Sequence, residues 1–164
     1  MTATSDDRPG NADLEIERKY LLSGTPPEAL GHPAIVVEQG YIPGRKLKER
    51  LRKSVFGDGS VRYYRTVKLG SGLVRTEIEE ETDERVFAHL WVLTEGRRIR
   101  KTRYVVPHAD FTWEIDVFTD RELVLAEVEL PDERAVAPIP PWLAPFLVEE
   151  VTGDKTYTNA SLAR

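Results

Sequence analysis

Three charged residues alternate with apolar ones in the segment LEIERKYLL, residues 14–22. Glu15, Glu17 and Lys19 fall on one side of an extended chain, because side chains alternate with a period of two along a β-strand. Two carboxylates beside an ammonium group could bind a divalent metal ion together with an anion, since hard oxygen ligands suit Mg²⁺ and Mn²⁺. A solvated face at a sheet edge would show the same pattern, so this strand alone leaves both interpretations open.

Charges of one sign are grouped along the chain. Residues 45–68 carry nine Lys or Arg against two acids, and residues 97–103 carry five bases and no acid. Residues 77–84 carry six acids and no base, and residues 110–133 carry nine acids against one arginine. Charged and apolar residues also alternate within these blocks, which predicts strands rather than disordered segments.

The periodicity predicts eight strands and one helix between them. The hairpin signal FGDGS at residues 56–60 joins two of the strands, because Asp-Gly suits a turn that needs positive φ. A period of 3.6 predicts the helix after residue 82, with Thr82 as N-cap and Gly96 closing it. The proline-rich remainder leaves room for short helices only, the last near Asn159 to Ala163. The strands are expected at 14–22, 36–42, 46–55, 61–69, 73–81, 97–106, 111–118 and 123–130.

This order of elements predicts a mainly β (α+β) protein with an antiparallel meander, and two architectures fit it. In a sandwich, the charged strand faces lie in water and pair across strands. In a closed eight-stranded barrel, the charged faces line the interior and helices pack outside, and the lumen has room for one small ligand. Inward carboxylates and inward Lys or Arg would then suit a divalent metal and an oligophosphate.

Composition excludes several functional classes. The 164 residues favour a flexible tail over residues 1–12 and a single domain over residues 13–164. The absence of cysteine excludes disulfides, thiol catalysis and the common zinc sites. A net charge of −5 argues against a nucleic-acid partner, and no apolar run is long enough to span a membrane. The start of the chain lacks the features of a secretory signal, which favours a cytoplasmic protein.

A series of motifs resembles the CYTH family, the triphosphate tunnel metalloenzymes. The EIERK of residues 15–19 is similar to the family's ExExK signature and begins the first predicted strand. The resemblance covers roughly residues 13–163 and implies a closed eight-stranded antiparallel tunnel with a charged interior. The motifs that follow in order are EQGYI (38–42), ERLRKS (49–54), RTVK (65–68), RTEIEEE (75–81), RKTRY (100–104), WEIDVF (113–118), LAEVEL (125–130) and GDKTYTNASLA (153–163).

The resemblance implies roles for the inward residues. Tyr41 would restrain Lys19, and Glu127 would orient the attacking water or bind a second metal ion. The implied ligands of Mg²⁺ or Mn²⁺ are Glu15, Glu17 and Glu129. The implied triphosphate-binding residues are Lys19, Arg50, Arg52, Lys68, Lys101 and Arg103. The inward acids that would support these groups or balance their charge are Glu77, Glu79, Glu114 and Asp116.

The implied activity is metal-dependent hydrolysis of the terminal phosphoanhydride bond of a triphosphate. The compact chain is similar to small bacterial inorganic triphosphatases, which favours tripolyphosphate as the substrate. A class IV adenylyl cyclase, a thiamine or nucleoside triphosphatase, and a polyphosphate- or nucleotide-binding module without turnover are the alternatives. The expected partner is a small triphosphate, and a homodimer through the apolar outer wall is left open.

Overall fold

The computed structural model describes residues 16–45, 47–69 and 76–164, so the predicted tail lies outside the described residues. In these ranges, nine strands form one antiparallel sheet in the order β5-β4-β3-β2-β6-β7-β8-β1-β9. The strands are β1 (Ile16–Leu22), β2 (Ala34–Ile42), β3 (Leu47–Val55), β4 (Val61–Leu69), β5 (Thr76–Thr82), β6 (Arg98–His108), β7 (Phe111–Phe118), β8 (Val124–Leu130) and β9 (Leu147–Glu150). The helices are α1 (Glu84–Trp91), α2 (Asn159–Leu162) and the short 3-10 turns η1 (Pro27–Gly31), η2 (Val92–Thr94), η3 (Ala144–Phe146) and η4 (Lys155–Tyr157).

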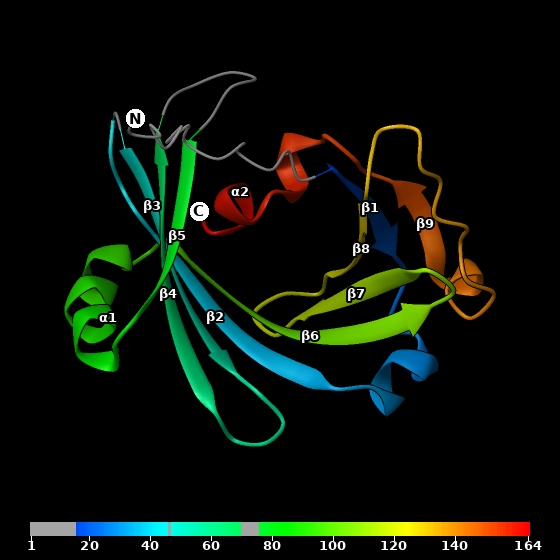
Figure 1. Cartoon of the computed structure of the whole chain (residues 1–164), viewed down its shortest axis with the longest axis horizontal. Coiled ribbons are helices and arrows are strands. Elements are labelled where there is room, and N and C mark those ends of the chain that lie inside the picture. The colour runs from blue at the N-terminus through cyan, green and yellow to red at the C-terminus, as the bar shows by residue number, and fades with distance from the viewer. Residues whose placement is uncertain (1–15, 46, 70–75) are drawn as a thin grey trace, which may run out of the picture.

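The sheet curves into a trough with two walls (Figure 1). The predicted mainly β, antiparallel fold is confirmed, but the predicted closure into an eight-stranded barrel is not confirmed. A ninth strand, which the sequence did not predict, pairs with β1 and places Tyr20 opposite Glu150 and Leu21 opposite Glu149. Strand β9 therefore occupies the edge that β1 would need to close the sheet, and the strand order ends at β5 on the other side.

The β3–β4 hairpin confirms the turn predicted at residues 56–60. Gly59 has a φ of 83°, a conformation that is strained for residues with a Cβ. The Asp58 carboxylate accepts hydrogen bonds from the Ser60 amide at 2.8 Å and from the Ser60 hydroxyl at 2.6 Å. This turn fixes the register that places Arg52 opposite Tyr64.

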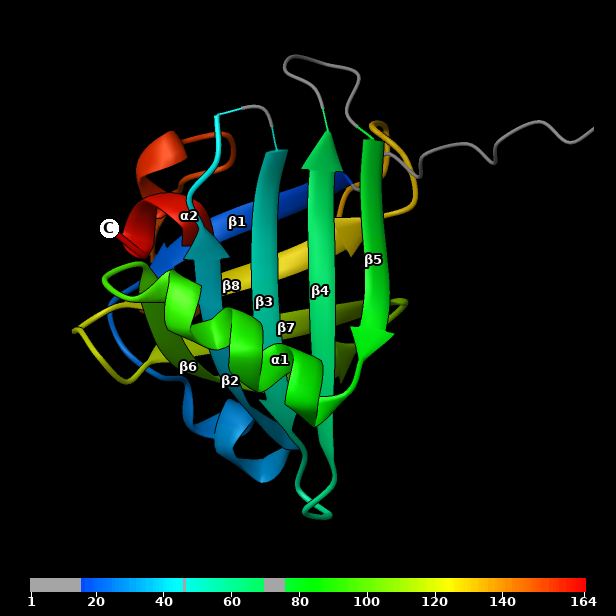
Figure 2. The same cartoon turned by 90° about the vertical axis from the view of Figure 1, so that its left-hand side faces the viewer.

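Helix α1 lies across the outer face of β2, β3 and β4 (Figure 2). Its N-cap is Asp83 and not the predicted Thr82, because the Asp83 carboxylate accepts a hydrogen bond from the Val86 amide at 2.8 Å. The contact between Phe87 of α1 and Tyr63 of β4 holds the helix on the sheet, and Phe87 also stacks on Trp91 within the helix. The Phe87 ring lies 4.9 Å from the Tyr63 ring and 5.0 Å from the Trp91 ring, measured between centroids.

The main apolar core lies on the outer face of β1, β6, β7 and β8. Trp113 and Ile115 of β7 are fully buried there, and η1 together with the segment 131–146 covers them, contributing Ala29 and Leu143. The apolar strand faces thus pack outward, which leaves the charged faces to line the trough. Among the described helices, none combines the length and the apolar character that crossing a membrane would require.

Gly40 of β2 lies against η2, and we expect the substitution Gly40→Ala to destabilise the protein. An added Cβ would lie 2.6 Å from Thr94 Oγ1 and 2.7 Å from Thr94 Cβ. Thr94 cannot easily yield, because its hydroxyl donates to the Trp91 carbonyl at 2.7 Å and accepts from Arg98 Nε at 2.8 Å. Overpacking of this kind costs about 1–3 kcal/mol of unfolding free energy, which urea denaturation measures. Gly57→Ala is the matched control, since nothing lies within 4 Å of its added Cβ; an equal loss there would contradict the steric explanation.

Candidate active site

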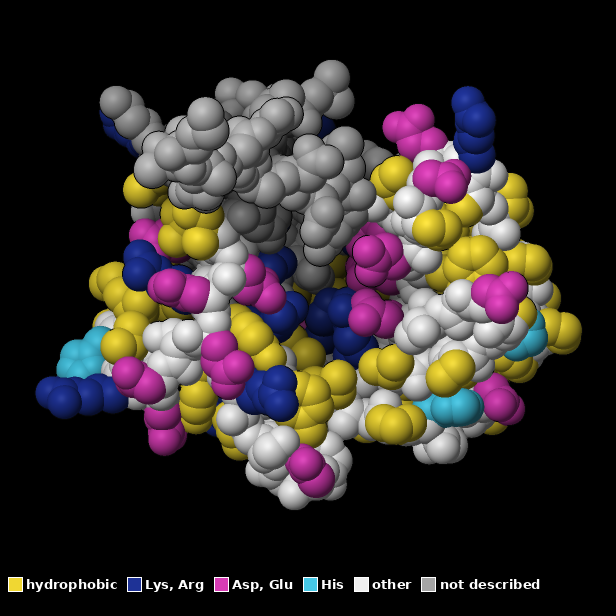
Figure 3. Space-filling view, in the orientation of Figure 1, with side chains coloured by type: hydrophobic (Ala, Val, Ile, Leu, Met, Phe, Trp, Pro, Cys, Tyr) yellow, Lys and Arg dark blue, Asp and Glu magenta, His cyan; other side chains and the backbone are white. Residues whose placement is uncertain are grey.

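The inner face of the sheet collects most of the predicted charged residues. Residues directly opposite one another in a strand pair share a face, so the register places Glu17 beside Glu129 and Lys19 beside Glu127. The same rule places Arg103 beside Asp116. Figure 3 shows Lys and Arg side chains on the floor of the hollow between the two walls, with acidic side chains near its rims. The trough is therefore a strongly charged surface on which both signs lie close together.

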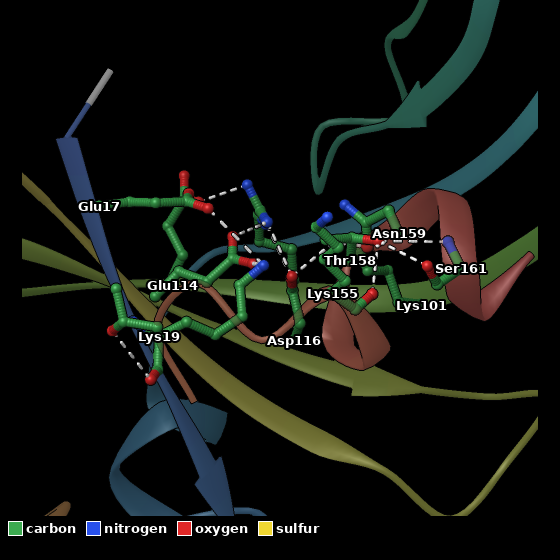
Figure 4. Close-up of polar contacts among 12 residues, drawn as sticks. Glu17, Lys19, Lys101, Glu114, Asp116, Lys155, Thr158, Asn159 and Ser161 are labelled. Atoms are coloured by element: carbon green, nitrogen blue, oxygen red, sulfur yellow. Dashed lines mark hydrogen bonds and ion pairs between the residues drawn. The ribbon is translucent and has the colours of Figure 1, made fainter. Parts of the chain in front are cut away.

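The first cluster is a chain of ion pairs on β1, β6, β7 and β8 (Figure 4). Lys19 Nζ lies 2.9 Å from a Glu127 carboxylate oxygen and 3.6 Å from Glu17 Oε1. Arg103 Nη2 donates to Glu127 at 2.9 Å and to Asp116 at 2.7 Å. Lys101 Nζ donates to Asp116 Oδ2 at 2.5 Å. We call these five residues, Lys19, Lys101, Arg103, Asp116 and Glu127, the buried ion cluster.

Asp116 is the centre of the buried ion cluster. Its side chain is fully buried, and burial alone would raise its pKa. The charges of Lys101 and Arg103 outweigh burial and lower the pKa of Asp116 to about 2. For Lys19, burial would lower the pKa, but the Glu127 carboxylate raises it above the ordinary value. Both groups are thus charged at neutral pH, and their charges hold the neighbouring side chains in place. Burial lowers the pKa of Lys101, and the Asp116 carboxylate opposes that effect.

Glu114 lies at the edge of this cluster and forms an ion pair with Arg103. Burial raises its pKa above the ordinary value; Arg103 lowers it, whereas the nearby charges of Asp116 and Glu127 raise it further. In the register of the sheet, Glu114 lies directly opposite Glu127. The position fits the predicted role of balancing charge.

The second cluster lies on β3, β4 and β5. Arg50 Nη2 donates to Glu79 Oε2 at 2.8 Å, and Arg52 Nη2 donates to Glu79 Oε1 at 3.1 Å. The Thr66 hydroxyl also donates to Glu79, at 2.9 Å. Although burial would raise the pKa of Glu79, the charges of Arg52 and Arg50 and the bond from Thr66 lower it. We call Arg50, Arg52, Thr66 and Glu79 the arginine cluster.

Arg52 has a buried hydrogen-bond donor that no described residue accepts. Its Nε–H is buried and without a partner within the part of the chain that the structure describes. Its guanidinium group lies 4.7 Å from the centre of the Tyr64 ring, a cation–π contact. Burial lowers the pKa of Arg52, and the Glu79 carboxylate opposes that effect. A buried donor without an acceptor is costly, and an oxyanion in the trough would satisfy it.

The predicted metal ligands are placed only in part. Glu15 lies outside the described residues, while Glu17 and Glu129 lie directly opposite each other and are exposed on the inner face. Within the described ranges, no three His, Cys, Asp or Glu side chains are grouped closely enough to hold a metal ion. Like charges directly opposite each other destabilise a strand pair, and a divalent cation between them would remove that repulsion. The two carboxylates therefore fit a hard cation such as Mg²⁺ or Mn²⁺.

Two known proteins that are similar to this chain along most of its length are inorganic triphosphatases. The inorganic triphosphatase of Nitrosomonas europaea is 41% identical over 156 residues, which cover 91% of this chain and 96% of that protein. The inorganic triphosphatase of Acetivibrio thermocellus is 39% identical over 92% of this chain and 93% of that protein. The chain belongs to the CYTH family, among the bacterial inorganic triphosphatases. No family model matched the sequence.

Solved structures agree with this membership of the CYTH family. A crystal structure of an inorganic triphosphatase superposes with a TM-score of 0.66 at 37% identity, covering 94% of this chain and 97% of that one. A protein from Pyrococcus horikoshii superposes with a TM-score of 0.52 at 21% identity and covers 73% of this chain and 80% of that one. At this low identity, the similarity to the Pyrococcus horikoshii protein shows a shared fold and nothing about its function.

The remaining residues that the CYTH motifs singled out lie on β2, β4 and β5. The Tyr41 hydroxyl accepts a hydrogen bond from Gln39 Nε2 at 2.6 Å. Lys68 lies opposite Glu77 in the β4–β5 register, and the side chain of Glu77 is outside the described residues. Tyr41 and Lys68 are both on the inner face, since Tyr41 lies opposite Arg50 and Lys68 is in phase with Thr66.

Sequence reasoning missed three polar residues of the CYTH site. Thr66 joins the arginine cluster, Gln39 contacts Tyr41, and Asn159 of α2 accepts from Lys101 Nζ at 3.5 Å (Figure 4). Thr66 is in phase with Lys68 on β4, and this alternation was the signal that could have identified it. Gln39 is next to Glu38, the one charged residue of β2, and so lies on the opposite face from it, which leaves no charge signal for Gln39. Asn159 has no such signal, because its position depends on how the C-terminal segment folds back.

One end of the trough is apolar. The inner face continues from the buried ion cluster to Leu125, Phe118 and Ile99, and these pack with Val151 and with Ala163, next to α2, in a second apolar cluster. In Figure 1, α2 lies between the two walls of the sheet. This CYTH chain thus fills one end of its charged trough with its own C-terminal segment.

Proposed function

We propose that this protein hydrolyses inorganic tripolyphosphate to pyrophosphate and phosphate. The named activity of its relatives supports the reaction class. The observation that carries the proposal is the buried Nε–H of Arg52, for which the described residues offer no acceptor and which lies on the same inner face as the buried ion cluster. Two cationic groups on facing walls can grip both ends of an oligophosphate, because arginine forks and lysine ammonium groups bind phosphate oxygens strongly.

The side chains of the trough supply binding and charge stabilisation. Arg50 and Arg52, with Lys68 on the neighbouring strand β4, would hold one end of the triphosphate. Lys19, Lys101 and Arg103 would hold the other end. In the reaction, a water oxygen attacks the terminal phosphorus, and the bond from that phosphorus to the bridging oxygen breaks with its electron pair going to pyrophosphate. The fixed cations stabilise the negative charge that develops on the phosphoryl oxygens.

Carboxylates complete the proposed site. Glu127 is held between Lys19 Nζ and Arg103 Nη2, each at 2.9 Å, which fixes its oxygen atoms for orienting the attacking water. Glu15, Glu17 and Glu129 would hold Mg²⁺ or Mn²⁺, whose chemistry is to neutralise charge on the phosphate chain. Glu77, Glu79, Glu114 and Asp116 would keep the cationic side chains in place. Tyr41 would support the substrate-facing side chains.

Phosphorus NMR of the purified protein tests the proposal. With Mg²⁺ or Mn²⁺ present, we expect tripolyphosphate to give equal amounts of orthophosphate and pyrophosphate, faster than ATP or thiamine triphosphate reacts in parallel samples. Cyclic AMP and pyrophosphate from ATP would instead assign a cyclase. Faster turnover of thiamine triphosphate or ATP to a diphosphate would assign an organic triphosphatase. Binding of tripolyphosphate without turnover of any substrate would reject an enzymatic function.

A further inference from the structure

Lys48 is a base on the inner face that lies outside both clusters described above. It is the second residue of β3 and is in phase with Arg50 and Arg52, so all three side chains lie on the same face of the strand. The two arginines are partly buried, whereas Lys48 is exposed. In the register of the sheet, Lys48 lies directly opposite Lys68, near the end of β4. Figure 2 shows this start of β3 beside the end of β4, so two lysines extend the arginine cluster to the edge of the sheet.

Lys48 differs from its neighbours along β3 in its lack of an ionic partner. Glu49 on the outer face lies 2.9 Å from Arg65 Nη2, and Arg50 on the inner face donates to Glu79 at 2.8 Å. Within the described residues, no carboxylate forms an ion pair with Lys48. Its position opposite a second lysine is also unfavourable, because like charges directly opposite each other destabilise a strand pair. Both features suit an anion that comes from outside the chain.

The proposed reaction sets which end of the substrate lies near Lys48. Glu127, which would orient the attacking water, is held in the buried ion cluster, so the reacting phosphoryl group lies on that side of the trough. The other end of the triphosphate then lies at the arginine cluster. Lys48 is two residues beyond Arg50 along the same face, which is about 6–7 Å and within reach of a lysine side chain.

This other end is where inorganic and organic triphosphates differ. In tripolyphosphate it is a terminal phosphate with ionised oxygens, whereas in ATP or thiamine triphosphate the same phosphate is esterified to an organic group. A lysine ammonium binds ionised phosphate oxygens strongly and gains little from an ester. An exposed lysine at this position therefore favours the inorganic chain.

We propose that Lys48 is a specificity-determining residue: together with Lys68 it binds the terminal phosphate that does not react, and so favours tripolyphosphate over triphosphate esters. This inference rests on the proposed function for the direction in which the substrate lies. It adds to that function a basis for selecting an inorganic substrate, because the phosphate groups bound by the two clusters are common to all triphosphates.

The experiment compares substrates in three variants. Lys48→Met removes the ammonium group and keeps a long, unbranched side chain, whereas Lys48→Arg keeps the positive charge. Lys53→Met is the matched control, because it removes the same charge from the outer face of β3, where Lys53 lies 3.9 Å from Glu38. We would measure kcat/KM with tripolyphosphate, ATP and thiamine triphosphate for each variant.

The expected result is a change of selectivity in one variant only. Lys48→Met should lower kcat/KM for tripolyphosphate about tenfold and for the two esters less than about twofold, because one charge-assisted contact is lost with the inorganic substrate alone. Lys48→Arg and Lys53→Met should keep the selectivity of the wild type. An equal loss for all three substrates in Lys48→Met would overturn the proposal.

Two further measurements separate a substrate contact from a structural role. Calorimetry in EDTA gives the Kd of tripolyphosphate and of ATP without turnover, and we expect Lys48→Met to weaken only the first about tenfold. Because Lys48 and Lys68 repel each other, the melting temperature of Lys48→Met without ligand should be unchanged or higher. A lower melting temperature with an unchanged ratio of the two Kd values would assign Lys48 a structural role and overturn the proposal.

The same measurements distinguish this inference from the proposed function. If the wild-type protein binds tripolyphosphate but does not hydrolyse it with Mg²⁺ or Mn²⁺, the proposed function fails, and the ratio of the Kd values still decides the role of Lys48. If the wild-type protein binds no tripolyphosphate with or without metal, both proposals are overturned. If it hydrolyses tripolyphosphate and Lys48→Met keeps the selectivity of the wild type, only the role of Lys48 is rejected.

Discussion

The substitution Glu17→Gln should reduce the turnover of tripolyphosphate about 100-fold or more while the protein stays folded. Glu17 is exposed on the inner face opposite Glu129, and its contact with Lys19 Nζ is long, at 3.6 Å. The side chain of Glu17 is half exposed, so removing its charge should cost the fold little. A bound metal ion would depend on it strongly, and losing about 3 kcal/mol of transition-state stabilisation corresponds to about 100-fold in rate.

The measurement is kcat at saturating tripolyphosphate over a range of Mg²⁺ and Mn²⁺ concentrations, with circular dichroism to check the fold. Glu80→Gln is the matched control, because it removes the same charge from an exposed residue of β5 whose contact is Arg65 at 3.8 Å. We expect this control to keep normal turnover. Full activity of Glu17→Gln would show that Glu17 is not a metal ligand, and Glu129 would then lack its proposed partner in binding the ion.

The substitution Asp116→Asn should be the most destabilising single change in the trough. It removes the carboxylate that accepts from Lys101 at 2.5 Å and from Arg103 at 2.7 Å. Asp116 and Lys101 are buried, and Arg103 is partly buried. Removing one partner of a buried ion pair costs about 3–5 kcal/mol, because the remaining charges stay buried without compensation. Since Lys101 and Arg103 would also lose their fixed positions, kcat/KM for tripolyphosphate should fall with the free energy of unfolding.

The lowered pKa of Asp116 also predicts how the free energy of unfolding depends on pH. The pKa of Asp116 is about 2 in the folded protein, below its ordinary value of 3.8. The ionised group therefore stabilises the fold above about pH 4, and this contribution of about 2 kcal/mol is lost as the pH falls toward 2. Urea denaturation between pH 2 and pH 6 should show this loss in the wild type and in the turn variant Asp110→Asn, but not in Asp116→Asn. A pH profile of Asp116→Asn that matches the wild type would assign the acid sensitivity to other carboxylates.

The sequence allowed the prediction of features that depend on alternation within a single strand. Charged and apolar residues alternate along β1, β7 and β8, so the charged face of each of these strands could be predicted before the structure. Strand β6 carries bases on both faces, and its phase was predicted only from the resemblance to the CYTH family. Strand β9 could not be predicted, because its four residues LVEE are all exposed and show no alternation. Its pairing depends on β1, which is remote in sequence, and this pairing separates the observed open sheet from the predicted closed barrel.

The contacts of a side chain and its burial were harder to predict from the sequence than the face of the strand on which it lies. The register places Asp116 opposite Arg103, but its central place in the buried ion cluster depends on Lys101 and Arg103, which belong to a different strand. Gln39 was missed because a neutral side chain adds nothing to a charge pattern. The N-cap of α1 was misplaced by one residue, since Thr82 and Asp83 are both good caps and only the backbone conformation selects between them.

The pairing of β1 with β8 and β9 also has a consequence for how the chain folds. The ion pair from Arg18 to Glu150 joins residues 132 positions apart, and the hydrogen bond from the Lys19 amide to Thr152 joins residues 133 apart. Closing such long loops is slow, so contacts of this range form late in folding. During synthesis, β1 would leave the ribosome first and remain unpaired until β8 and β9 had also emerged. Lys19 would therefore contact Glu127 only after the sheet had formed. We therefore expect activity to appear with the slowest phase of refolding.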